Sequence, residues 1–133
     1  MIVADTSALA AIAFGEPERD LFLEAITRTS RVLVSVPSAL ETRMVVHSRR
    51  GQAAVVFVDD LLHLPKFELV PPGQAELNAA YAAFVAYGRG SGHPAALNYG
   101  DLFSYALAKV RGLPLLFKGD DFAKTDISPA VKH

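Results

Sequence analysis

Cysteine is absent from all 133 positions of the chain. Its absence excludes disulfide bonds, thiolate nucleophiles and the zinc or iron sites that cysteine ligands build. Long apolar runs are missing too, since no segment approaches the roughly 20 residues of a membrane-spanning helix. The apolar stretch at residues 1–4 is too short for a signal peptide and has no basic flank. We therefore expect a cytoplasmic protein with no membrane association.

An excess of charge of either sign is also lacking. The 13 basic and 14 acidic side chains give a formal net charge of −1, so bulk positive charge cannot hold a nucleic acid. Any phosphate must be bound locally, by a metal ion or by a few Lys and Arg side chains. With 51% hydrophobic and 20% charged residues, the chain is too apolar to be disordered. Its length predicts one domain over residues 1–133.

Short apolar segments alternate with helical ones along the chain. The apolar, partly β-branched segments predict strands at residues 2–4, 31–35, 67–70 and 114–117, with a further short strand near Ile127. Capping residues, apolar periodicity and Gly or Pro stops predict helices at residues 8–14, after a cap at Thr6 or Ser7, and from Pro17 through Ile26. Further helices are predicted at residues 37–50, 52–64, 75–87 and 98–109. This alternation predicts a three-layer α/β/α fold with a mainly parallel central sheet of four to five strands.

Acidic residues follow the predicted strands or lie early in the predicted helices. The acids in such places are Asp5, Glu41, Asp101, Asp120 and Asp121. Because the carboxyl ends of parallel strands share one edge of a sheet, these side chains can converge there. A cluster of carboxylates with no counter-charge is costly unless a hard divalent cation binds it. The pattern therefore suggests a Mg²⁺- or Mn²⁺-dependent hydrolase acting on phosphodiesters.

Each acid also has a purely structural interpretation. Asp5 could cap the first helix, and Glu41 has the spacing of a capping-box partner of Ser38. The helix macrodipole alone would favour Asp101 in the first turn of its helix. Turn chemistry could account for the Gly-Asp-Asp sequence at residues 119–121. The residues alone leave both interpretations open.

Four segments, in order along the chain, resemble the PIN-domain ribonucleases and in particular the VapC-type toxins of bacterial toxin–antitoxin pairs. The first is Val-Ala-Asp-Thr-Ser-Ala-Leu at residues 3–9, and the second is the helix that carries Glu41. The third covers residues 93–108 around Asn-Tyr-Gly-Asp-Leu, and the fourth covers residues 116–127 around Gly-Asp-Asp-Phe. Together these segments reach from one end of the chain to the other.

The resemblance implies a small PIN-like domain whose acidic pocket binds Mg²⁺ or Mn²⁺ and cleaves RNA. Transferred to this sequence, the four acids are Asp5, Glu41, Asp101 and Asp121, with Asp120 as the alternative for the fourth. Asp5 and Asp101 are the expected direct metal ligands. The other two acids would act through water or on a second metal ion.

The resemblance also assigns supporting roles and products. Thr6 and Ser7 match hydroxyl positions that support the first acid. In-line attack by water is expected to leave a 3′-hydroxyl and a 5′-phosphate, which requires no catalytic histidine. His93 is accordingly interpreted as a loop or packing residue, and terminal His133 is expected to be disordered.

The expected partners are an RNA substrate, a second copy of the chain in a homodimer, and a cognate antitoxin. The antitoxin's tail would lie in the acidic groove, and apolar patches within residues 17–64 would provide contact surfaces. The alternative is a catalytically inert PIN-like module that only binds a protein. A haloacid-dehalogenase-type phosphatase is excluded because Ser7 stands where that chemistry needs a second Asp. A dinucleotide-binding domain is excluded because no glycine fingerprint follows the first strand.

Overall fold

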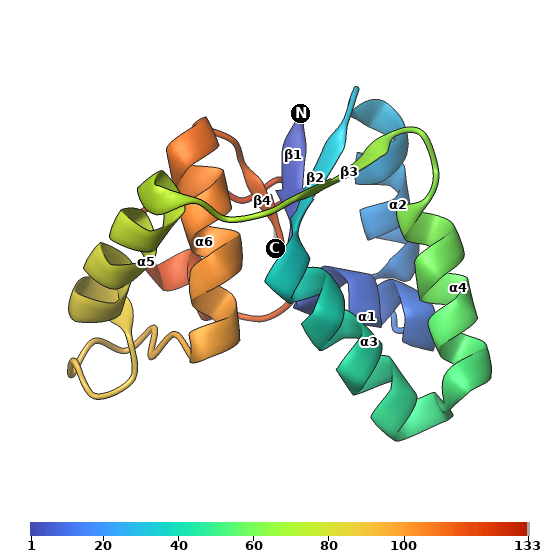
Figure 1. Cartoon of the computed structure of the whole chain (residues 1–133), viewed down its shortest axis with the longest axis horizontal. Coiled ribbons are helices and arrows are strands. Elements are labelled where there is room, and N and C mark those ends of the chain that lie inside the picture. The colour runs from blue at the N-terminus through green and yellow to red at the C-terminus, as the bar shows by residue number, and fades with distance from the viewer. Residues whose placement is uncertain (133) are drawn as a thin grey trace.

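The computed structural model describes residues 1–132, which form a four-stranded sheet enclosed by helices (Figure 1). The elements of the first half, in chain order, are β1 (Ile2–Ala4), α1 (Thr6–Phe14), α2 (Arg19–Arg28), β2 (Val32–Ser35), α3 (Val36–Arg50) and α4 (Gln52–Leu62). Those of the second half are β3 (Phe67–Val70), α5 (Gln74–Tyr87), α6 (Tyr99–Arg111), β4 (Leu115–Leu116) and the 3₁₀ turn η1 (Phe122–Lys124).

The strands run parallel in the order β3-β2-β1-β4. Chain connections therefore move outward from β1 to β3 on one side, and the last strand returns to the other side of β1. The reversal places a topological switch point between β1 and β4, where open parallel sheets bind ligands at the carboxyl ends of their strands. The residue that follows β1 is Asp5.

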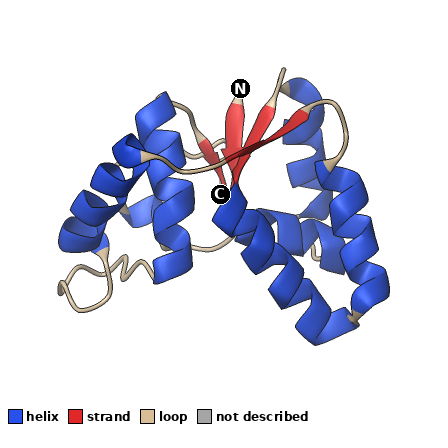
Figure 2. Ribbon diagram, in the orientation of Figure 1, coloured by secondary structure: helices blue, strands red, loops and turns tan. Residues whose placement is uncertain are grey.

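Helices cover both faces of the sheet. In Figure 2 the red strands stand between two groups of blue helices, and the labels of Figure 1 identify α5 and α6 on one side and α1 to α4 on the other. The alternation of side chains along β1 explains this, since Ile2 and Ala4 join one buried cluster while Val3 joins the other. The predicted three-layer α/β/α arrangement is confirmed.

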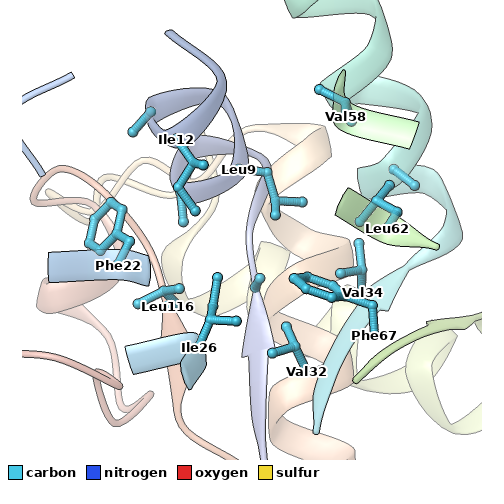
Figure 3. Close-up of a cluster of buried hydrophobic side chains, with 14 of the residues drawn as sticks. Leu9, Ile12, Phe22, Ile26, Val32, Val34, Val58, Leu62, Phe67 and Leu116 are labelled. Carbon is cyan, nitrogen blue, oxygen red and sulfur yellow. The ribbon is translucent and has the colours of Figure 1, made fainter. Parts of the chain in front are cut away.

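The larger buried cluster lies under α1, α2 and α4. Phe22 and Ile26 of α2 meet Val32 and Val34 of β2 there, with Leu9 from α1 (Figure 3). Phe22 is fully buried. Since burying a large apolar side chain contributes roughly 1.5–3 kcal/mol, this cluster fixes the first half of the chain against the sheet.

Three predictions about local structure were wrong. Ser38 does not cap α3, because Ser35 is the N-cap residue and the Ser38 hydroxyl instead contacts Ser104 at 3.1 Å. The second helix begins at Arg19 rather than at Pro17. Near Ile127 the chain forms only a single β-bridge, between Leu115 and Pro129, instead of a strand. Within residues 1–132, no helix is both long enough and apolar enough to cross a bilayer.

Candidate active site

Asp5 lies in the interior of the molecule, directly after β1. Its backbone N–H donates to the carbonyl of Leu116 in the neighbouring strand at 2.9 Å, and only 3% of the residue is exposed. Its carboxylate caps α1 by accepting a hydrogen bond from the backbone N–H of Ser7 at 3.0 Å. The capping role that the sequence suggested is therefore real, and it places the carboxylate at the carboxyl edge of the sheet.

Two hydroxyl groups complete the hydrogen bonding of the Asp5 carboxylate. Ser7 Oγ donates to Oδ2 at 2.7 Å, and Ser104 Oγ, from α6, donates to Oδ1 at 2.6 Å. Ser7 Oγ in turn accepts a hydrogen bond from the backbone N–H of Lys118 at 3.0 Å. Ser7 therefore joins the first acid to the loop that follows β4.

Glu41 comes from the second turn of α3 and is half-buried. Its Oε1 accepts a hydrogen bond from Thr6 Oγ1 at 3.0 Å, and Thr6 Oγ1 itself accepts one from Thr42 Oγ1 at 3.3 Å. Burial raises the pKa of Glu41, the Thr6 hydrogen bond lowers it, and the negative charge of Asp5 raises it further. Glu41 is thus held by a partner in α1 rather than by a capping box of its own helix.

Gly100 provides the space that the Glu41 carboxylate occupies. A Cβ atom at residue 100 would lie 2.6 Å from both Oε1 and Oε2 of Glu41. Real Cβ atoms do not approach other atoms so closely, so any larger residue would displace the carboxylate. The second residue of α6 therefore determines where the acid of α3 can lie.

Asp101, the third residue of α6, forms a capping box with the N-cap residue Asn98. The Asn98 side-chain oxygen accepts from the Asp101 N–H at 2.9 Å, and Asp101 Oδ2 accepts from the Asn98 N–H at 3.0 Å. Burial raises the pKa of Asp101 to about 6 against the lowering effect of that backbone bond, and the charges of Asp5, Asp121 and Glu41 raise it as well. These are three carboxylates close enough to repel a fourth.

The fourth acid lies in the loop between β4 and η1. Asp121 is exposed, precedes η1, and is one of the charges that raise the pKa of Asp101, whereas exposed Asp120 is not among them. This difference supports Asp121 over Asp120 as the fourth member of the cluster. Acids from four separate segments of the chain are therefore close enough for their charges to act on Asp101.

The arrangement fits a metal ion that keeps most of its own water. Among residues 1–132, no three acidic or histidine side chains are placed to ligate one ion together. Mg²⁺, however, is commonly held by one or two carboxylates, several waters and the substrate phosphate. Asp5, Glu41, Asp101 and Asp121 supply oxygen donors only, which select a hard cation over a soft one. A positive charge among them would also relieve the repulsion that raises the pKa of Asp101.

His93 and Lys118 contact residues other than the four acids, and Arg89 lies in an adjoining groove. His93 Nδ1 accepts the backbone N–H of Ala95 at 3.0 Å, and its ring packs edge-on against Tyr87. This matches the packing role expected of it, while His133 lies outside the described residues. Lys118 pairs with Glu16 at 2.8 Å rather than facing the acids. Arg89 is exposed and lines a groove beside Glu41.

That groove adjoins the acidic cluster and has a volume of about 670 Å³. Its other lining residues, which are mostly apolar, include Pro37, Leu40, Met44, Tyr99 and Phe103. Tyr99 is 78% exposed although it packs edge-on against Phe103. This apolar surface on α6 was not predicted from the sequence.

Sequence reasoning also missed Ser104 and Gly100, which both contact the acids. Ser104 lies three residues after Asp101, so both side chains project from the same face of α6. That spacing was a usable signal for Ser104. The role of Gly100 depends on the approach of α3, which no local pattern encodes.

Comparison with known proteins gives consistent matches along the chain. The family model described as the PIN domain matches residues 2–128. Ribonuclease VapC30 of Mycobacterium tuberculosis is 45% identical over 127 residues, covering 96% of each chain.

Two solved structures have a similar fold. One is VapC20 of Mycobacterium tuberculosis, described as a sarcin-ricin loop cleaving toxin, with a TM-score of 0.79 and 18% identity over 96% of each chain. The other is VapBC2 of Rickettsia felis bound to a DNA fragment from its promoter. It has a TM-score of 0.74 and 12% identity over 97% of this chain and 96% of that one.

Proposed function

This chain belongs to the PIN-domain family, among the VapC-type ribonucleases, and from this premise we propose that it is the toxin of a toxin–antitoxin pair that cleaves RNA phosphodiesters with Mg²⁺ or Mn²⁺. The active domain would be the whole of residues 1–133, working in the cytoplasm. The observation that carries the proposal is geometric: the Glu41 carboxylate lies against Gly100, next to Asp101, and Ser104 of the same helix bonds the Asp5 carboxylate. Capping accounts for single acids but not for their convergence.

The four acids would divide the work according to their surroundings. When bound, the divalent cation supplies a Lewis acid for the phosphodiester and lowers the pKa of the attacking water. Asp5 and Asp101 would hold it, because they are the more deeply buried pair and come from the switch point and the adjoining helix. Glu41 would orient the water or accept its proton at Oε2, since Oε1 is held by Thr6. The exposed Asp121 would act through water or on a second ion.

The direct test is cleavage of RNA by the purified chain, with and without chelator. Asp5→Asn and Asp101→Asn should each lose activity while remaining folded, and chelation should abolish wild-type cleavage without unfolding the protein. Asp20→Asn is the matched control, because Asp20 also lies in the first turn of a helix but is exposed on α2, away from the cluster. Unchanged cleavage by the Asp5 and Asp101 variants would contradict the proposed site.

A catalytically inert binding module is the alternative that the same assay separates. If the folded wild-type chain cleaves no RNA at any Mg²⁺ or Mn²⁺ concentration yet binds a protein partner, that alternative holds. Since the four acid positions are all filled, we propose the nuclease.

We further propose that the chain pairs with an antitoxin and forms a homodimer. Another solved structure of similar fold, with a TM-score of 0.68 and 18% identity, is described as a toxin-antitoxin complex from Klebsiella pneumoniae. Large exposed apolar side chains within residues 17–64 are available for such contacts: Leu21, Val36, Leu40, Met44, Val56, Phe57 and Leu64. An antitoxin that placed an Arg or Lys among the acids would compete with the cation for the same charge. Light scattering of the isolated chain should give the mass of a dimer, and a monomer would refute that part.

A further inference from the structure

We propose that Ser104 is a positioning residue that fixes the Asp5 carboxylate for the divalent cation, an inference that rests on the proposed metal-dependent function. Ser104 is 0% exposed, and its hydroxyl donates to Asp5 Oδ1 at 2.6 Å. A contact this short between a hydroxyl and a carboxylate is a strong, charge-assisted hydrogen bond. The two residues are 99 positions apart, so the bond joins α6 to the end of β1.

The direction of the hydroxyl is determined by its second neighbour. Ser38 Oγ lies 3.1 Å from Ser104 Oγ, and either atom could donate on geometry alone. A serine hydroxyl has one proton, and that of Ser104 is committed to Asp5. Ser38 must therefore donate to Ser104, which leaves a one-way relay from α3 through α6 to Asp5. The Ser104 hydroxyl has no reason to turn away, because both of its interactions favour the same orientation.

The bond to Ser104 completes the support of a buried carboxylate. Oδ2 is held from one side by the N–H and the hydroxyl of Ser7. Oδ1 accepts its hydrogen bond from the Ser104 hydroxyl. Without the hydrogen bond from Ser104, the Asp5 carboxylate would be held only at Oδ2 and could rotate about its Cβ–Cγ bond. A metal ligand needs its oxygen lone pairs held at a defined angle, and hydrogen-bond partners behind the ligand commonly provide that.

The same helix thus contributes at two levels. Asp101 belongs to the acid cluster itself, and Ser104, one turn later, reaches the acid of β1 from behind. A side chain there must be small as well as hydroxylated, because the position is fully enclosed. Alanine would keep the packing and remove both the donor to Asp5 and the acceptor of Ser38, and Ser38→Ala removes the second interaction alone.

The experiment measures Mn²⁺ binding to the full chain directly, by electron paramagnetic resonance titration with Mn²⁺ as the only ligand. Ser104→Ala should raise the Kd about ten- to a hundredfold, the usual loss when a partner behind a metal ligand is removed. Ser38→Ala removes only the outer member of the relay and should raise the Kd less. The control Ser48→Ala, an exposed serine whose hydroxyl bonds the Met44 carbonyl at 2.8 Å, should leave the Kd unchanged.

A folded Ser104→Ala variant with the wild-type Kd would overturn the inference and leave the proposed function intact. A wild-type chain that binds no Mn²⁺ would instead overturn the proposed function on which it rests. If Ser104→Ala does not fold, Ser104→Cys provides the second test, since a thiol is a weak donor of similar size. Its Kd should then exceed that of the wild type, and an equal Kd in that folded variant would also refute the role of the hydroxyl.

Discussion

Replacing Gly100 by Ala should separate activity from stability in this protein. The new Cβ would lie 2.6 Å from both carboxylate oxygens of Glu41, whereas ordinary contact begins at 3.4 Å. The carboxylate must therefore retreat by about 0.8 Å, the difference between these two distances. The Glu41 carboxylate can move because it is the far end of a flexible side chain. Its 3.0 Å hydrogen bond from Thr6 would then be stretched or lost.

The expected magnitudes differ sharply for the two properties. Misplacement of a reacting group by about 1 Å can reduce catalysis on the order of a hundredfold. Stability should stay the same or rise, since Ala favours a helix over Gly by up to about 1 kcal/mol and residue 100 has no left-handed backbone that would need Gly. The assay combines kcat for cleavage of a fluorophore-labelled RNA with the melting temperature of the metal-free protein.

Gly73→Ala is the matched control for that experiment. A Cβ at residue 73 would meet only Glu76 Oε2, at 4.0 Å, and Gly73 is the N-cap residue of α5, not a neighbour of the four acids in the contacts of its Cβ. It should leave kcat unchanged. Wild-type kcat in Gly100→Ala would refute the placement of Glu41, and a large drop in its melting temperature would refute the claim that only the carboxylate moves.

Three further predictions concern stability. The pKa of Asp101 is raised from 3.8 to about 6, so the contribution of this carboxyl group to the free energy of unfolding is complete below pH 3.8 and is lost as the pH rises through 6. In the presence of chelator, the free energy of unfolding of the wild type should therefore fall over this range by on the order of 1 kcal/mol after solvent screening. Asp101→Asn should remove that fall. Guanidinium unfolding at pH 5 and pH 7 measures this, and equal pH slopes in both proteins would contradict it. Tyr105→Phe removes a 2.6 Å hydrogen bond to Asp126 and should cost about 1 kcal/mol by urea unfolding; no loss would mean the bond is not maintained in solution. Phe22→Ala, at a fully buried position, should cost about 3–5 kcal/mol by the same method, and a loss under 1 kcal/mol would contradict the packing under α2.

The strands and their acids were predictable because local signals encode them. The sequence Ile-Val-Ala before Asp5 indicates a buried strand. An acid directly after a central parallel strand lies at the edge of the sheet where ligands bind. The order of the strands in the sheet is not encoded in this way. It depends on how α5 and α6 pack together before the chain returns to the sheet beside β1.

Capping boxes could not be assigned from residue spacing alone. Ser38 and Glu41 have the spacing of a capping box, yet Ser38 contacts Ser104 and Glu41 contacts Thr6. The true capping box is formed by Asn98 and Asp101. The same residue types satisfy both arrangements, and only the approach of a second helix decides between them. Gly100 was missed for the same reason, since it acts on an acid that another segment supplies, whereas the spacing of Ser104 from Asp101 on α6 was a usable signal.

The exposed apolar surfaces were only partly predicted. Apolar patches were expected within residues 17–64, and several large side chains are exposed there. Further exposed apolar side chains lie outside that range, on α5 and at the start of α6: Leu77, Tyr81, Phe84, Val85 and Tyr99. The alanine-rich composition of α5 has little contrast between its faces, so periodicity could not show which face would be left uncovered.

The most direct test of the central claim is to locate bound Mn²⁺ by paramagnetic broadening of backbone amide signals in the isotope-labelled protein. If the acids of β1, α3, α6 and the loop after β4 share one cation, broadening at low Mn²⁺ should centre on Ser7, Glu41, Asp101 and Asp121, and Mg²⁺ should reverse it. Broadening centred on exposed acids elsewhere, such as Asp20, would contradict the account, as would an absence of broadening at these four residues.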